Sequence, residues 1–158
     1  MPAALKVQAS IETWPIAGAF VISRGAKREA TVVVAEVSDG THTGRGECCP
    51  YARYGETVEG VAQAIAAVGN IASRAELAER LAAGAARNAL DCALWDWEAK
   101  HAGASAASLA GMPPLRAVTT AYTISLGAPE EMAAKAAAAR RRRCRPGRDC
   151  APGPRVCG

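Results

Sequence analysis

Alternation of apolar and polar side chains opens the chain. Every second residue over positions 5–11 is apolar, and a period of two predicts a strand with one buried face. We expect Pro15 to end this strand and residues 15–25 to form a loop. A second strand, rich in valine, is predicted over residues 31–37, and residues 38–41 have the turn composition of a hairpin.

The return strand of this hairpin is predicted over residues 42–48. It carries Gly44 and Gly46 on one face, which indicates that another backbone approaches closely there. The first 48 residues therefore predict a three-stranded antiparallel meander.

Apolar residues at three- and four-residue steps predict helices in the middle of the chain. Thr57 is expected to cap the first helix, and Ser73 with Glu76 forms a capping box for the second. The longest helix is predicted over residues 87–100, and Gly103 is its expected stop. Its apolar stripe consists of Ala86, Leu90, Ala93, Leu94 and Trp97.

The pattern changes after one more helical turn at residues 105–109. A Gly-Met-Pro-Pro break at 111–114 is the best candidate domain boundary. Beyond it, residues 117–126 predict a strand, and Pro129 begins a helix with acidic residues in its first turn.

Charge is distributed unevenly over the 158 residues, whose formal net charge is +4. Residues 140–158 hold seven arginines and one aspartate, so the rest of the chain is mildly acidic. This tail has no apolar period, and we expect it to be disordered. Four consecutive arginines could bind phosphate groups, but the tail has no aromatic side chain for base stacking. A nucleic-acid partner is therefore not expected.

The six cysteines lack the regular spacing of a disulfide framework. No apolar run reaches the roughly 18 residues that cross a bilayer, and no secretory signal opens the chain. These patterns predict a cytoplasmic protein with reduced thiols and no membrane partner. His42 and His101 have no partner at ligand spacing in the sequence, so both are interpreted as structural.

Four separated segments carry a more specific pattern. They are FVISRG at 20–25, GECCPYARYGE at 46–56, AARNALDCALWD at 85–96, and TAYTIS at 120–125 followed by PEEMA at 129–133. In this order they resemble the dipeptide epimerases of the enolase superfamily, and most of all the bacterial L-Ala-D/L-Glu epimerases. The resemblance runs from about residue 7 to about residue 139.

The resemblance implies an α+β fold in three parts. Residues 1–112 would form an enolase-like N-terminal capping domain, residues 113–139 the first strand and helix of an incomplete (β/α) barrel, and residues 140–158 the basic tail. In this family, barrel lysines exchange the α-proton of an Ala-Glu-type dipeptide through an enediolate. Barrel acids hold the Mg²⁺ that stabilises the developing negative charge.

Five residues match substrate-contacting positions of the family. Arg24 lies on the first cap loop, Tyr51, Arg53 and Tyr54 lie on the second, and Thr123 ends the first barrel strand. The lysine pair and the metal-binding acids of the barrel have no counterpart in this chain. The resemblance therefore assigns it no catalytic residue and no metal ligand, and we expect no Mg²⁺ to bind.

A complete barrel needs roughly 250 residues, so the chain resembles a truncated epimerase that we expect to be inactive. The abrupt basic tail suggests a frameshift. Reading the DNA in the other two frames past codon 139 would then reveal a Lys-x-Lys strand. Muconate-cycloisomerase-like and succinylbenzoate-synthase-like enzymes share the cap layout and stay open as alternatives. So does a non-catalytic remnant that self-associates through its exposed barrel-facing surface.

Overall fold

The computed structural model describes residues 4–22, 25–118 and 121–142. The chain divides into two compact units. The first contains residues 1–14 and 29–115, and the second contains residues 15–28 and 116–158. Among the described residues, every helix is too short or too polar for a bilayer span.

The sheet is antiparallel and has four strands in the order β3-β2-β1-β4. Its members are β1 (Leu5–Ile22), β2 (Gly25–Ser38), β3 (Thr43–Cys48) and β4 (Asn70–Ile71). The predicted meander is confirmed as β1 to β3. The added strand, β4, has two residues and pairs Leu5 with Ile71, which is too short a run to show any period.

The predicted loop at residues 15–25 is wrong over its described part, because β1 continues through Pro15 to Ile22. Proline lacks an N–H donor and is tolerated where a strand edge has no partner. In the described chain, β4 pairs β1 only at Leu5 and Lys6, so this edge of β1 is open at Pro15.

Among the described residues of the first unit, five helical segments follow the third strand. They are the 3₁₀ turn η1 (Ala52–Tyr54) and the α-helices α1 (Val58–Ala66), α2 (Arg74–Arg80), α3 (Ala85–His101) and α4 (Ala106–Leu109). The predicted caps are confirmed: Thr57 Oγ1 accepts the N–H of Gly60 at 3.0 Å, and Ser73 Oγ accepts that of Glu76 at 3.1 Å. The capping box differs in one detail, since Glu76 accepts the N–H of Ala72 at 2.8 Å rather than that of Ser73.

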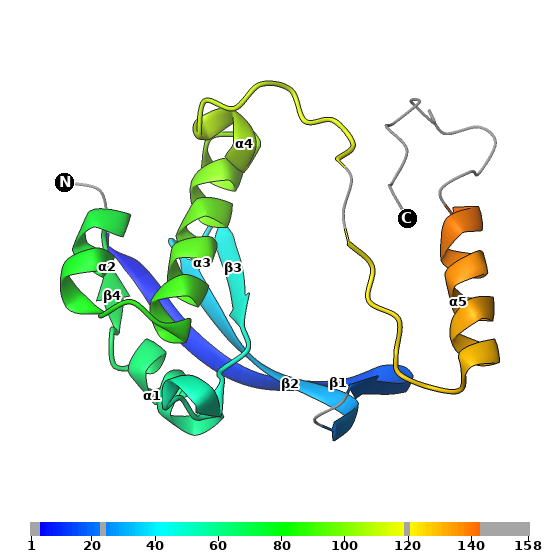
Figure 1. Ribbon diagram of the computed structural model, residues 1–158. Helices are drawn as coiled ribbons and strands as arrows, with labels where there is room; N and C mark the ends of the chain where they lie inside the picture. The colour runs from blue at the N-terminus through cyan, green and yellow to red at the C-terminus, as the bar shows by residue number, and fades with distance from the viewer. Residues whose placement is uncertain (1–3, 23–24, 119–120, 143–158) are drawn as a thin grey trace. The chain divides into compact units, whose positions relative to one another are not determined.

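The longest helix, α3, packs along β3 (Figure 1). Leu90, Ala93 and Leu94 of its predicted stripe are almost completely buried, while Ala86 and Trp97 are partly buried against the core. The predicted close approach at Gly44 and Gly46 is confirmed, because backbone atoms of α3 occupy the space where their side chains would lie. The core of the first unit thus forms between the sheet and helices α1 to α3.

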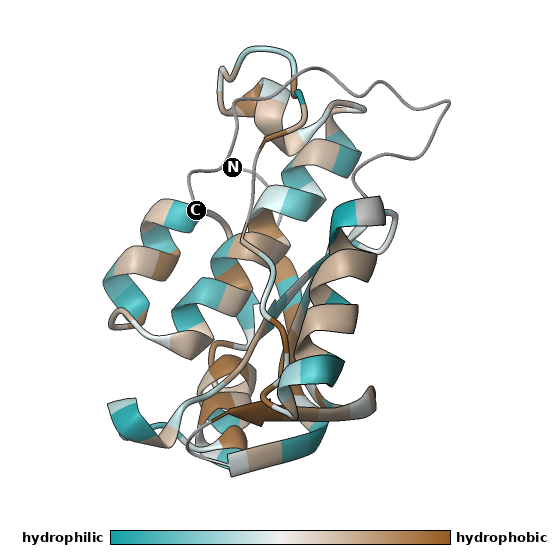
Figure 2. Cartoon of the chain, turned by 45° about the vertical axis from the view of Figure 1, so that its right-hand side comes forward, coloured by the Kyte–Doolittle hydropathy of each residue, from teal (hydrophilic) through white to brown (hydrophobic). Residues whose placement is uncertain are grey.

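The second unit contains the distal parts of β1 and β2 and the helix α5 (Pro129–Arg142). The helix confirms the prediction of a helical start at Pro129, and Figure 2 shows it in pale brown along its alanine-rich middle. The predicted strand over 117–126 is not formed in the described residues. A strand needs a partner, and Leu126 makes one backbone hydrogen bond, at 2.9 Å, from its N–H to the carbonyl of Val21.

Candidate functional site

An open hollow of 680 Å³ lies where β3 ends, beside η1 and the start of α3. It belongs to the first unit. Its wall is formed by Glu47, Cys48, Cys49, Tyr51, Tyr54, Glu56, Ala83, Gly84, Ala85 and Asn88.

Glu56 fixes the loop beside this hollow. Its Oε1 accepts the N–H of Ala85 at 2.7 Å, and its Oε2 accepts the N–H of Tyr51 at 3.2 Å. One carboxylate therefore ties the loop to the first residue of α3, where the helix dipole favours a negative charge. Gly55 allows the loop to turn back, because its φ of 74° is easily reached only by glycine.

Two of the predicted substrate-contacting residues lie together in this hollow. The rings of Tyr51 and Tyr54 are 6.4 Å apart between centroids, and at least half of each side chain is exposed. Arg53 lies between them in η1 and is exposed, but it does not line the hollow. Two phenol rings beside a carboxylate-anchored loop offer apolar faces and hydroxyl groups to a small polar ligand.

The other two predicted contacts are Arg24 and Thr123. Arg24 lies outside the described residues. Thr123 belongs to the second unit, where it is exposed and lies in neither a helix nor a strand. The grouping of all five residues around one substrate therefore stays a prediction.

Sequence reasoning missed two features. In the sequence Glu56 is only one position of the 46–56 motif, whereas in the structure it anchors the loop. Asp39, His42 and His101 come together at the other end of α3, and the two histidines are too far apart in the sequence for any ligand spacing to reveal this. The backbone N–H groups of His42 and Thr41 lower the pKa of Asp39 to about 2, so its carboxyl is ionised at neutral pH.

The described residues do not fit the Mg²⁺ site that the family implies. Mg²⁺ prefers carboxylate, carbonyl and water oxygens. The group of potential metal ligands found in the described part of the chain has two imidazoles and one carboxylate.

Comparison with known proteins identifies the class of this fold. The chain belongs to the mandelate racemase/muconate lactonizing enzyme family, because the N-terminal domain of that family matches residues 4–111. The predicted resemblance to the enolase superfamily is confirmed by this match.

Individual relatives show which members of the family this chain is similar to. The L-Ala-D/L-Glu epimerase of Escherichia coli (strain K12) is 47% identical over 126 residues, which are 77% of this chain and 39% of that enzyme. An enolase family member from Agrobacterium tumefaciens, solved with sodium and L-Ala-L-Glu, is 48% identical with a TM-score of 0.72, covering 85% of this chain and 42% of that one.

A dipeptide epimerase from Methylococcus capsulatus, solved with Mg and L-Arg-D-Lys, is 27% identical with a TM-score of 0.74. That comparison covers 87% of this chain and 43% of the other. This chain thus spans about two fifths of the length of the relatives that it matches.

Proposed function

We propose that this chain is the N-terminal part of a Mg²⁺-dependent dipeptide epimerase that inverts the second residue of an Ala-Glu-type dipeptide by 1,1-proton transfer at Cα. The observation that carries the proposal is the 47% identity to the L-Ala-D/L-Glu epimerase of E. coli. The A. tumefaciens relative, with its bound L-Ala-L-Glu, points to the same substrate class.

The contribution of this chain is to bind and enclose the dipeptide. Arg24 would pair with a substrate carboxylate, for which a guanidinium is well suited because it donates two parallel hydrogen bonds. Tyr51, Arg53 and Tyr54 would close over the substrate from the second loop. Glu56 supports this role, since it ties that loop to α3 through Ala85, and a loop held in place loses less entropy on binding. Thr123 would contact the substrate from the barrel side.

The 158 residues alone are expected to show no turnover, because they supply neither the lysine pair nor the metal-binding acids of the family. A chimera tests the proposal more directly. Residues 1–139 of this chain are joined to the remaining C-terminal part of the E. coli relative, and epimerisation of L-Ala-D-Glu at the Cα of Glu is measured with Mg²⁺. We expect turnover by the chimera and none by the 158-residue chain.

Substitution of Arg24 in the chimera tests whether this residue binds the dipeptide. Arg24→Ala should raise KM for the dipeptide, whereas Arg28→Ala, an exposed arginine of β2, should leave KM unchanged. A chimera that folds and binds Mg²⁺ but does not act on L-Ala-D-Glu would refute the proposed substrate class. Turnover of muconate-type or succinylbenzoate-type substrates instead would favour the alternative enzymes.

A second candidate function is self-association through exposed apolar side chains. More than half of the surface of each of five large hydrophobic residues between positions 112 and 126 is exposed: Met112, Leu115, Val118, Tyr122 and Leu126. Exposed apolar side chains that gather in a patch favour association. Light scattering of the full chain should show a dimer or larger species, and Leu115→Ser with Val118→Ser should shift it to monomer. A monomer before the substitutions would exclude this function.

A further inference from the structure

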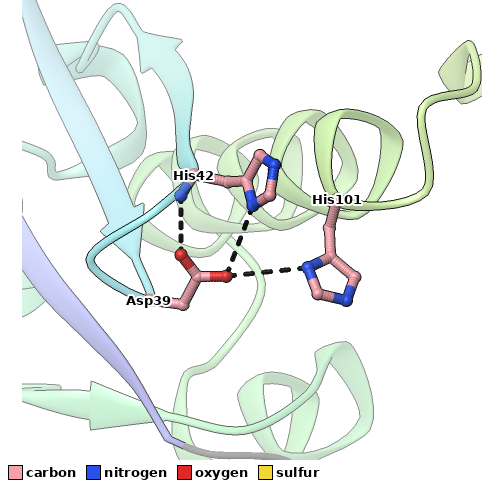
Figure 3. A group of neighbouring side chains, drawn as sticks. All are labelled: Asp39, His42 and His101. Atoms are coloured by element: carbon pink, nitrogen blue, oxygen red, sulfur yellow. Dashed lines mark hydrogen bonds and ion pairs between the residues drawn. The ribbon is translucent and has the colours of Figure 1, made fainter.

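Both histidines of the chain converge on one carboxylate, Asp39 (Figure 3). Asp39 lies in the turn between β2 and β3, His42 ends that turn, and His101 is the last residue of α3. The Nδ1 atoms of His42 and His101 are each 3.6 Å from Oδ2 of Asp39. All three ligand atoms lie within 4.8 Å of one another.

The turn holds the carboxylate in this position. Oδ1 of Asp39 accepts the N–H groups of Thr41 at 2.8 Å and of His42 at 2.6 Å. The other oxygen, Oδ2, is left facing both imidazoles, as Figure 3 shows. These hydrogen bonds from backbone N–H groups to the side chain also stabilise the turn, so the fold of the hairpin orients the carboxylate.

The imidazoles are positioned by aromatic packing. The His101 ring stacks on Trp97 with centroids 4.9 Å apart and planes 21° from parallel. His42 meets His101 edge to face at 5.5 Å between centroids. Since Trp97 packs against the core of the first unit, these contacts limit the rotation of the exposed histidine.

One ring nitrogen in the cluster is chemically unsatisfied. Nδ1 of His42 is buried and has no hydrogen-bond partner, because 3.6 Å is too long for a hydrogen bond to Asp39. A buried polar atom without a partner destabilises the folded state. This nitrogen could therefore bind a ligand that lies between the imidazole and the carboxylate.

The spacing suits a metal ion. Zinc binds nitrogen at about 2.0–2.1 Å and carboxylate oxygen at about 2.0–2.2 Å, so tetrahedral ligands lie roughly 3.3–3.5 Å apart. The two distances of 3.6 Å need to shorten only slightly. Two imidazoles and one carboxylate are also a donor set typical of zinc and similar transition metals.

We propose that Asp39, His42 and His101 form a binding site for a divalent transition metal ion of the Zn²⁺ type, with water as the fourth ligand. The ion would join the β2–β3 turn to the C-terminal end of α3, where the helix dipole favours a positive charge. Binding to the folded state alone would stabilise it. This site is independent of the proposed epimerase function, because all three ligands belong to the capping fold.

Zn²⁺ alone, added to the metal-free full chain, tests the proposal. Because the chain has two histidines, their imidazole NMR signals report directly on the site. We expect one equivalent of Zn²⁺ to shift both sets of signals together and to raise Tm. Cysteines can also bind Zn²⁺, but thiol binding would leave the imidazole signals in place.

Two variants and a control complete the experiment. Asp39→Asn keeps the acceptor for Thr41 and His42 but removes the charge, and His101→Gln replaces a side chain that is 59% exposed, so both should fold. Each should weaken Zn²⁺ binding by about tenfold or more, while Asp91→Asn on the same helix should have no effect. Unchanged imidazole signals at saturating Zn²⁺, or wild-type affinity in His101→Gln, would overturn the proposal.

Discussion

The backbone of Gly46 in β3 lies directly against the main-chain carbonyl of Ala89 in α3. Two residues earlier on the same face of the strand, Gly44 packs in the same way against Ala93 and Trp97. The longest helix of the first unit therefore rests on the sheet with no side chain from these two positions between them. This approach lets Leu90 and Leu94 reach the core, where both are almost completely buried.

Gly46→Ala should therefore destabilise the fold. An added Cβ would lie 2.6 Å from the backbone nitrogen of Ala93 and 2.9 Å from Cβ of Cys92, both closer than real contacts allow. We expect the free energy of unfolding to fall by about 1–3 kcal/mol, the usual range for overpacking. Urea denaturation followed by circular dichroism measures this.

Glu47→Ala is the matched control, because Glu47 is the next residue on β3 and is exposed. Its unfolding free energy should stay close to that of the unmodified chain. Equal stability of the two variants would show that α3 can move away from β3 without loss, which contradicts the close packing.

Local chemistry made much of this fold predictable. A hydroxyl before each helix predicted the caps at Thr57 and Ser73, and glycines spaced by two predicted the contact with α3. These are short-range rules, since each depends on residues within about one turn or one strand pair. The Pro129 helix followed from the same kind of rule.

The features that the sequence did not predict depend on contacts between residues that are far apart in the chain. Pro15 predicted a strand end because proline cannot donate a backbone hydrogen bond. It is tolerated within β1 because β4 pairs only with the start of that strand, and the sequence does not reveal where β4 pairs. Asp39 and His101 meet only because β2, β3 and α3 pack as they do, and no sequence spacing encodes that meeting. Tyr51 and Tyr54 were predicted as site residues from the family resemblance. The anchoring role of Glu56 was not predicted, because it depends on a hydrogen bond from Ala85, which is 29 residues away.

Stability should depend on pH through Glu76. Hydrogen bonds from the backbone N–H of Ala72 and from the Arg80 side chain lower the pKa of Glu76 below its ordinary 4.5. A carboxyl with a lowered pKa in the folded state stabilises the fold fully above its unfolded value. This stabilisation is lost as the pH falls below about 4.5 towards the lower folded value.

Urea titrations at a series of pH values check this dependence. Glu76→Gln should be less stable than the unmodified chain at neutral pH, and the difference should shrink as the pH falls below 4.5. Glu79→Gln, an exposed position on the same helix, serves as the control. A difference for Glu76→Gln that stays constant down to acid pH would contradict the role of its charge.

The adjacent cysteines should differ in reactivity. Burial raises the pKa of the Cys48 thiol to about 11, and its S–H donates to the carbonyl of Val33. Because the thiolate is the reactive form, Cys48 should stay unmodified by iodoacetamide at neutral pH. The exposed Cys49 and Cys92 should react. Peptide mass spectrometry measures the modification of each, and unfolding in urea should make Cys48 reactive as well. Equal rates at Cys48 and Cys49 in the folded chain would show that β3 opens readily.

Arg74 should couple α2 to α3. Its guanidinium carbon lies 3.5 Å above the ring of Trp95, and its Nη2 is 3.1 Å from Oε2 of Glu98. Cation–π contacts and partly exposed ion pairs each stabilise by about 0.5–1 kcal/mol. Arg74→Ala should therefore lower the free energy of unfolding by roughly 1–2 kcal/mol, and Arg74→Lys by less, because lysine keeps the charge but loses the planar stack.

The two contributions of Arg74 can be separated by salt. A double-mutant cycle of Arg74→Ala with Glu98→Gln measures the ion pair, and its coupling energy should decrease as the salt concentration rises. A cycle with Trp95→Leu measures the stacking contact, which lies against the ring face and should respond less to salt. If both couplings disappeared together at high salt, the contact with Trp95 would depend on the ion pair with Glu98 to hold the guanidinium in place. If the Trp95 coupling persisted, the stacking alone would suffice to dock α2 on α3.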